Sequence, residues 1–217
     1  MLERSRKTGA IIAIILATIV IVSITVVVPA AMSSTLTWSV SLGDEASYHV
    51  TVDAWQSNVS YVVPPPSRYA LLNGLNISAD IIALPELGWF LNGGDFAERV
   101  VRKEKMNVTF QNGTAIPEDI SVRLKSMLSA CILPTGSWLL IDSFYPATHG
   151  TGPGTDTYWS YSDTDSFHFG YYAFGIDSVT RMSSSVSYET GLPKVVSYYY
   201  RHGADSIYNL TLLCIVN

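Results

Sequence analysis

The stretch SVSYETGLPKVVSYYYRHGADSIYNLTLLCIV, residues 185–216, decides the fold of this chain. It contains three runs rich in Val, Tyr, Leu and Ile, which are residue types that favour strands. Short turn sequences separate the runs, GLP at 191–193 and HGAD at 202–205. The pattern predicts a three-stranded antiparallel meander, with strands at 185–190, 194–201 and 207–216.

Alternating apolar residues predict further strands upstream of this meander. Tyr48, Val50 and Val52 alternate with polar residues, which predicts a strand with one buried face after the turn at 43–45. Near position 170, the same alternation places the aromatic residues Phe167, Phe169 and Tyr171 on one face of a strand. We expect strands at 36–42, 47–55, 75–84, 106–110 and 138–145, the first two forming a hairpin.

One segment has the periodicity of an amphipathic helix. Pro117 suits the first turn, and Glu118 and Asp119 favour the positive end of the helix dipole. The apolar residues that follow on a single helical face are Ile120, Leu124, Met127, Leu128 and Cys131. A shorter helix is expected from Asp95 to about residue 104, where Asp95 and Glu98 resemble a capping box. We therefore predict an α+β fold, in which one or two helices cover a dominant, curved antiparallel sheet.

The N-terminal segment has the length and composition of a membrane-spanning helix. Residues 9–28 carry no charge, and a helix of this length rises about 30 Å, the thickness of a hydrocarbon core. Basic residues within 4–7 precede the run, whereas the first charges after it are Asp44 and Glu45. The positive-inside rule therefore predicts a single-pass signal anchor with a cytoplasmic N-terminus. The predicted regions are a basic leader at 1–8, the anchor at 9–31 and an extracytoplasmic β-rich domain at 32–217.

The alternative to an anchor is a cleaved signal peptide. The small residues of Pro29-Ala30-Ala31-Met32 resemble a cleavage point. The apolar run is longer than the usual signal core of about 7–15 residues, which favours a retained anchor.

The outer domain is acidic. From Met32 onward it carries ten Lys or Arg and seventeen Asp or Glu, a net charge of −7, which argues against nucleic acid as a partner. A location outside the cytoplasm permits glycosylation and disulfides. Cys131 and Cys214 either form one bridge or remain two buried thiols. The candidate glycosylation sites are Asn58, Asn76, Asn107, Asn112 and Asn209.

No pattern of residue types in the sequence indicates catalysis. The histidines at 49, 149, 168 and 202 have neither the mutual spacing nor the nearby cysteines of a metal site, and no Gly-x-Ser-x-Gly occurs. The acidic Asp163-Thr164-Asp165 lacks the glycine and glutamate of an EF-hand loop and is interpreted as a solvated turn. We assign no catalytic residue, no metal and no cofactor, and we regard enzymatic activity as the less favoured hypothesis.

Aromatic residues are concentrated between positions 158 and 174. A concave sheet lined by such residues holds a lipid tail or stacks on sugars, whereas the alternative is ordinary core packing. The residues that we expect to face a ligand are Tyr158, Trp159, Phe167, Phe169 and Tyr171.

The start of the outer domain, WSVSLGDEASYHV at 38–50, resembles the opening of uncharacterised archaeal cell-surface proteins of the choice-of-anchor type. ETGLP at 189–193 and YNLTL at 208–212 are similar to the closing meander of those domains, and also to that of half-barrel lipoprotein carriers. Those carriers hold acyl chains under a curved sheet. The resemblance implies a surface location and a β-rich fold, and it assigns no functional residue. Members often carry a C-terminal membrane helix, whereas the apolar run here is N-terminal.

Three hypotheses for the function follow. The first is a membrane-anchored, extracytoplasmic binding or envelope-associated protein without enzymatic activity, which recognises an envelope protein, a glycan or a lipid. The second is a carrier of a lipid or another hydrophobic ligand, with a half-barrel pocket. The third is an extracytoplasmic hydrolase. The hypotheses differ in what the concave side of the sheet must hold, because a carrier needs an open apolar pocket there.

Overall fold

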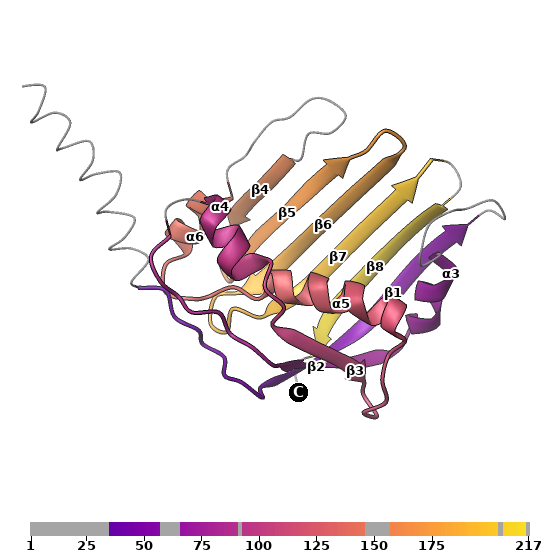
Figure 1. The fold of residues 1–217 in the computed structure, drawn as a ribbon, viewed down its shortest axis with the longest axis horizontal. Coiled ribbons are helices and arrows are strands. Elements are labelled where there is room, and N and C mark those ends of the chain that lie inside the picture. Colours follow the sequence, from indigo (N-terminus) through magenta and orange to yellow (C-terminus); the bar gives the residue numbers. More distant parts are fainter. Residues whose placement is uncertain (1–34, 57–65, 91–92, 146–156, 204–205, 216–217) are drawn as a thin grey trace, which may run out of the picture.

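The computed structural model describes residues 35–56, 66–90, 93–145, 157–203 and 206–215. Within these residues, eight strands form one open antiparallel sheet in the order β3-β2-β1-β8-β7-β6-β5-β4. Helices cover one face of this sheet (Figure 1), so the domain is α+β, as predicted. The strands are β1 (Glu45–Gln56), β2 (Asn76–Ile81), β3 (Met106–Phe110), β4 (Thr157–Ser162), β5 (Ser166–Phe174), β6 (Ser178–Ser187), β7 (Pro193–His202) and β8 (Ser206–Ile215). The helical elements are α3 (Pro66–Tyr69), η2 (Ala70–Leu72), α4 (Gly93–Phe96), η3 (Ala97–Val101), α5 (Glu118–Cys131) and α6 (Trp138–Phe144).

Strand β1 joins the two halves of the sheet. On one side it pairs with β2, and on the other with β8, where Val50 lies opposite Leu212. The β6–β7–β8 meander predicted from residues 185–216 is present, although β6 begins earlier, at Ser178. The pairing of β1 with β8 therefore connects the strands β1–β3 to the five C-terminal strands.

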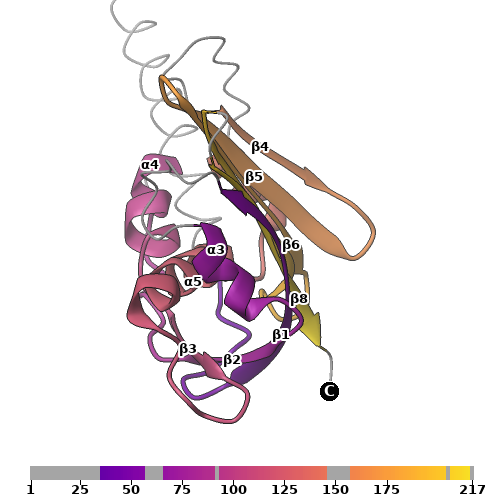
Figure 2. The ribbon, with the colours of Figure 1, turned by 90° about the vertical axis from the view of Figure 1, so that its right-hand side faces the viewer.

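The sheet curves around helix α5 (Figure 2). This helix lies on the concave face and packs against β3 and β7. Its predicted apolar face is the one that is buried, since Ile120, Leu124 and Leu128 have no exposed surface. Burying each such side chain stabilises the fold by about 1.5–3 kcal/mol. The elements α4, η3 and α6 lie over the β4–β5 end of the sheet (Figure 1).

The strand predicted at 36–42 does not form. Thr37 makes an isolated bridge with Thr135, while Leu36 and Val40 are buried in the core. The predicted hairpin is wrong because β1 takes both of its neighbours, β2 and β8, from later in the chain.

The strand predicted at 138–145 is also wrong, because residues Trp138–Phe144 form helix α6. Leu140, Ile141 and Phe144 are buried at helical spacing, whereas Leu139, directly before them, is 80% exposed. A short apolar run fits a strand or a helix, and packing against the rest of the domain decides between them.

The predicted leader at 1–8 and anchor at 9–31 lie outside the described residues. Among the helices that the structure describes, none has the length and apolar character to cross a membrane.

Candidate functional site

A cavity of about 900 Å³ lies between the concave face of the sheet and the helices. Its floor belongs to strands β4, β5, β6 and β7, and its roof to α4, η3, α5 and α6. The volume lies within the range of about 300–1,000 Å³ that is typical of pockets for small ligands.

Strand alternation builds the floor of the cavity. Tyr158 lies opposite Tyr171, Tyr171 opposite Met182, and Met182 opposite Tyr198, across four neighbouring strands. Residues in direct register point to the same side of a sheet, as do residues two apart in one strand, which adds Phe169 to this face. The result is a row of aromatic and thioether side chains under the helices.

The roof combines aromatic with small side chains. Phe96 from α4 stacks on Phe144 from α6, with ring centroids 4.7 Å apart. Helix α5 contributes Met127 and Ala130, which lie four and seven residues after Arg123 and therefore on the same helical face. The small roof residues that also line the cavity are Gly93, Gly94, Ala97, Ser126 and Ser143.

We call Arg102, Arg123 and Ser126 the mouth of the cavity, because they are exposed lining residues from the end of η3 and from α5, which pack together; Gly94 and Ser143 of the lining are exposed as well. These residues are exposed, whereas Met182 and Tyr198 on the floor are only 5% and 2% exposed. The Arg123 guanidinium carbon lies 5.3 Å from the Tyr198 ring centroid, within the range of a cation–π contact. The cavity-lining residues that the structure describes include these two arginines and no acidic side chain. The lining itself is therefore positively charged, although the charge of Arg102 has the Glu98 carboxylate beside it, outside the lining.

Two tyrosine hydroxyls bring polar groups into the apolar lining. The Tyr145 hydroxyl is shielded from solvent and has no hydrogen-bond partner among the described residues. Burial raises the pKa of Tyr145 well above its usual value, and burial also raises the pKa of Tyr171 to about 12. Both phenols are therefore neutral at physiological pH and keep a proton to donate.

The five aromatic residues expected to face a ligand divide into two groups. Tyr158, Phe169 and Tyr171 line the cavity. Phe167 is on the same face but is buried against Trp138, with ring centroids 5.4 Å apart. Trp159 is on the opposite face, where its ring lies so close to Gly170 that a Cβ there would be 2.6 Å from it. Neither Phe167 nor Trp159 borders the cavity.

The sequence reasoning missed the arginines of the mouth and much of the floor. Met182 and Tyr198 lie in strands that were predicted only in part or without a stated face. Arg123 is exposed, off the buried face of α5, and lines the cavity. The spacing of Arg123, Met127 and Ala130 is a signal that a second, partly polar face of α5 borders a pocket.

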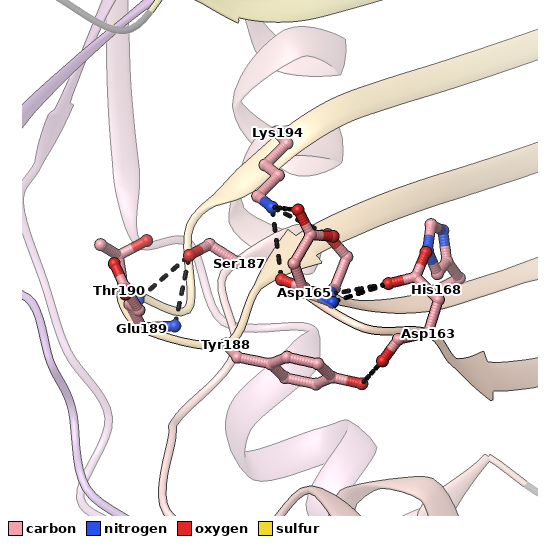
Figure 3. A network of polar contacts seen from close by, with 9 residues as sticks. Asp163, Asp165, His168, Ser187, Tyr188, Glu189, Thr190 and Lys194 are labelled. Atoms are coloured by element: carbon pink, nitrogen blue, oxygen red, sulfur yellow. Dashed lines mark hydrogen bonds and ion pairs between the residues drawn. The ribbon is translucent and has the colours of Figure 1, made fainter.

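The acidic turn at 163–165 is held by contacts within the domain (Figure 3). His168 bonds the Asp163 carboxylate at 2.6 Å, and Lys194 pairs with Asp165 at 3.0 Å. The backbone N–H of Asp165 and the His168 ring lower the pKa of Asp163 to about 2. The Tyr188 hydroxyl donates to the Asp163 carbonyl, which ties the β4–β5 turn to the β6–β7 turn. Within the described residues, no group of three or more His, Cys, Asp or Glu side chains is placed to hold a metal ion.

The candidate modification sites that the structure describes are not among the residues lining the cavity. Asn112 is exposed in a turn, where it accepts hydrogen bonds from Thr114, and Asn209 is exposed on β8. Asn76 and Asn107 are half-buried in β2 and β3, and Asn58 lies outside the described residues. Cys131 and Cys214 are free thiols, the first buried and the second half-buried.

No protein-family model, no curated protein and no solved structure matches this chain.

Proposed function

We propose that this domain binds one hydrophobic ligand, such as a lipid acyl chain, in the cavity between the sheet and the helices. The observation that carries the proposal is an apolar, aromatic-lined volume of about 900 Å³ whose lining includes solvent-exposed residues at the end of η3 and on α5. Pockets for small ligands combine a mostly apolar lining with a few placed polar groups, and this lining has both.

The side chains of the roof are more typical of a binding pocket than of a filled core. Small side chains from α4, η3, α5 and α6 border the same volume, opposite the large side chains of the floor. If the helices served only to cover the sheet, larger apolar residues at these positions would fill the space and add packing contacts. The retained space fits a flexible chain lying along the floor.

The predicted signal anchor would place the domain beside membrane lipids, which are a source of such ligands. We propose that residues 9–31 tether the domain to the outer face of a membrane, where lipids are at hand and where residues 32–217 are extracytoplasmic. Protease added to intact cells should then degrade residues 32–217. Protection of these residues would contradict the proposed location, although it would leave the binding proposal standing.

The binding proposal is tested by photolabelling in the cell. Cells that make the full chain are grown with a photoactivatable palmitic acid, irradiated, and the labelled peptides of the purified protein are identified by mass spectrometry. We expect the label on floor or roof residues such as Met127, Phe169, Tyr171 and Met182, since only the cavity offers them to a ligand.

A matched pair of variants separates the cavity from the surface. Ala130→Trp places a large ring in the cavity and should abolish the label. Val122→Trp makes the same kind of change at a position of α5 that is 60% exposed, and it should leave the label intact. Equal labelling of both variants, or label spread over exposed residues, would refute the proposal.

A further inference from the structure

We propose that the cavity mouth selects amphiphiles with an anionic head group, a carboxylate or a phosphate, through Arg102 and Arg123. This inference rests on the proposed function, because it assigns the head group of the ligand whose chain occupies the cavity.

The charge at the mouth contrasts with that of the domain. From Met32 onward the chain has a net charge of −7, yet the ionisable side chains of Asp, Glu, Lys and Arg type in the described lining are two arginines. Scattered surface charge in an acidic domain would place carboxylates there more often than guanidinium groups. A local positive site within a negative surface attracts an anion over short distances and orients it.

The two arginines come from different elements and both line the cavity. Arg102 follows the last residue of η3, and Arg123 lies in the second turn of α5, which packs against η3. Ser126, three residues after Arg123, places a hydroxyl beside them. Guanidinium groups suit carboxylate and phosphate because their planar N–H donors bind two oxygens at once.

The aromatic floor holds Arg123 in place. Its guanidinium lies over the Tyr198 ring, and a guanidinium that stacks by its face still presents N–H donors along its edge. The ring is 2% exposed and belongs to the cavity floor, so a head group at Arg123 would be continuous with a chain on the floor.

Arg102 can exchange its present partner for a ligand. It pairs with Glu98 one turn earlier, and the two side chains are 64% and 62% exposed. Such exposed pairs contribute little to stability, so a bound anion replaces the Glu98 carboxylate at small cost.

The test compares photoactivatable probes that share one acyl chain and differ only in the head group: the fatty acid, the fatty alcohol and the monoacylglycerol phosphate. Each probe is offered to the full chain over a range of concentrations, and the labelled cavity peptides are quantified. We expect both anionic probes to label the cavity at concentrations about tenfold lower than the alcohol does, since hydrogen bonds to charged groups are worth at least that factor. The ratio of acid to phosphate labelling then identifies the source of the head group.

Variants assign the preference to the mouth. Arg123→Gln and Arg102→Gln should each reduce the preference for the anionic probes over the alcohol about tenfold, a ratio that cancels any change in the cavity that affects all three probes alike. Arg123→Lys keeps the charge and should keep part of the preference. Arg181→Gln is the matched control, because Arg181 makes a similar stack on Tyr172 at 5.2 Å but lies outside the cavity lining.

The outcomes separate the two proposals. If the alcohol labels the cavity as well as the anionic probes do, or if the Gln variants keep the preference, the head-group inference is overturned while the hydrophobic-ligand function stands. If no probe labels the cavity of the wild-type chain, the proposed function fails and the head-group inference fails with it.

Discussion

We expect the free energy of unfolding to rise by about 1.5 kcal/mol between about pH 7 and about pH 8.5, because of one buried lysine. Lys105 has no exposed surface. Its Nζ donates to the Ser129 carbonyl at 2.6 Å and, at longer distances, to the carbonyls of Val101 and Lys103. These carbonyls lie near the ends of η3 and α5, where backbone oxygens lack helical partners.

The sign and size of the effect follow from burial. Desolvation lowers the pKa of Lys105 from 10.5 to about 7 in the folded domain. Between these values the unfolded chain holds a proton that the folded chain has lost, so stability rises with pH, by at most about 1.4 kcal/mol per unit. Near pH 7 the folded lysine is still about half protonated, which reduces the total.

The buried thiol of Cys131 sets the upper limit of the pH range in which the pH dependence of stability reports on Lys105 alone. Burial raises the pKa of Cys131 from 9.0 to about 12. In alkaline solution the unfolded thiol loses a proton that the folded one keeps, so stability then falls as pH rises. Measurements below the usual pKa of a thiol therefore isolate Lys105.

The assay is urea unfolding of the full chain, followed by tryptophan fluorescence at a series of pH values. Lys105→Met should show a flat profile, and Lys103→Met, which removes an exposed neighbour, should keep the wild-type rise. If Lys105→Met does not fold, the pH dependence of the unfolding free energy of the wild-type chain alone still tests the prediction. A flat wild-type profile would refute the reasoning, because it would mean that the surrounding carbonyls keep the ammonium charged despite its burial.

Three further predictions concern binding and stability. Competition against cavity photolabelling by fatty acids of increasing length should strengthen by about fourfold per added CH₂ until the chain fills the cavity, since burying a CH₂ is worth about 0.8 kcal/mol; a length-independent series would contradict a chain in the cavity. Tyr48→Phe should raise the urea midpoint by the equivalent of about 1–3 kcal/mol, because the buried Tyr48 hydroxyl has no hydrogen-bond partner among the described residues, and a loss of stability would show that it has one. Gly191→Ala should destabilise by several kcal/mol, since its Cβ would lie 2.0 Å from the Leu133 carbonyl oxygen; Gly113→Ala, at a similar positive φ with open space around it, should cost only about 1–2 kcal/mol, and equal costs would remove the steric argument.

Local patterns predicted much of the fold because they reflect local physics. The α5 helix could be located from Pro117, the acidic first turn and the apolar spacing, since each acts within one or two turns of the helix. The β6–β7–β8 meander was predicted because strand propensity and turn residues occur side by side in the sequence.

Long-range pairing left no such signal in the sequence. β1 and β8 pair although most of the described chain separates them in sequence, and the composition of neither strand indicates which strand it pairs with. Residues 36–42 have strand-like composition, yet Thr37 finds only one bridge because β1 is already paired on both sides. Helix α6 was missed for the same reason, since its apolar run fits two structures and the packing of Phe144 against Phe96 is a tertiary contact.

Only the sheet side of the candidate site was predictable from the sequence. Alternation placed Phe169 and Tyr171 on the concave face, but whether that face is filled depends on the side chains that the helices bring to it. The arginines were not predictable as part of one site, since Arg102 and Arg123 line the same cavity only because η3 packs on α5.

The size of the cavity constrains what it does. The cavity of about 900 Å³ has solvent-exposed residues in its lining, so it is open to the surrounding solution and not an enclosed void. The volume must therefore hold water or a ligand in solution. Water there meets mainly Phe, Met and Tyr faces and finds few hydrogen-bond partners, so an apolar chain displaces it with a gain in free energy. The apolar lining therefore favours an apolar chain over water, and in the head-group proposal the two arginines hold the polar end of that chain outside the cavity.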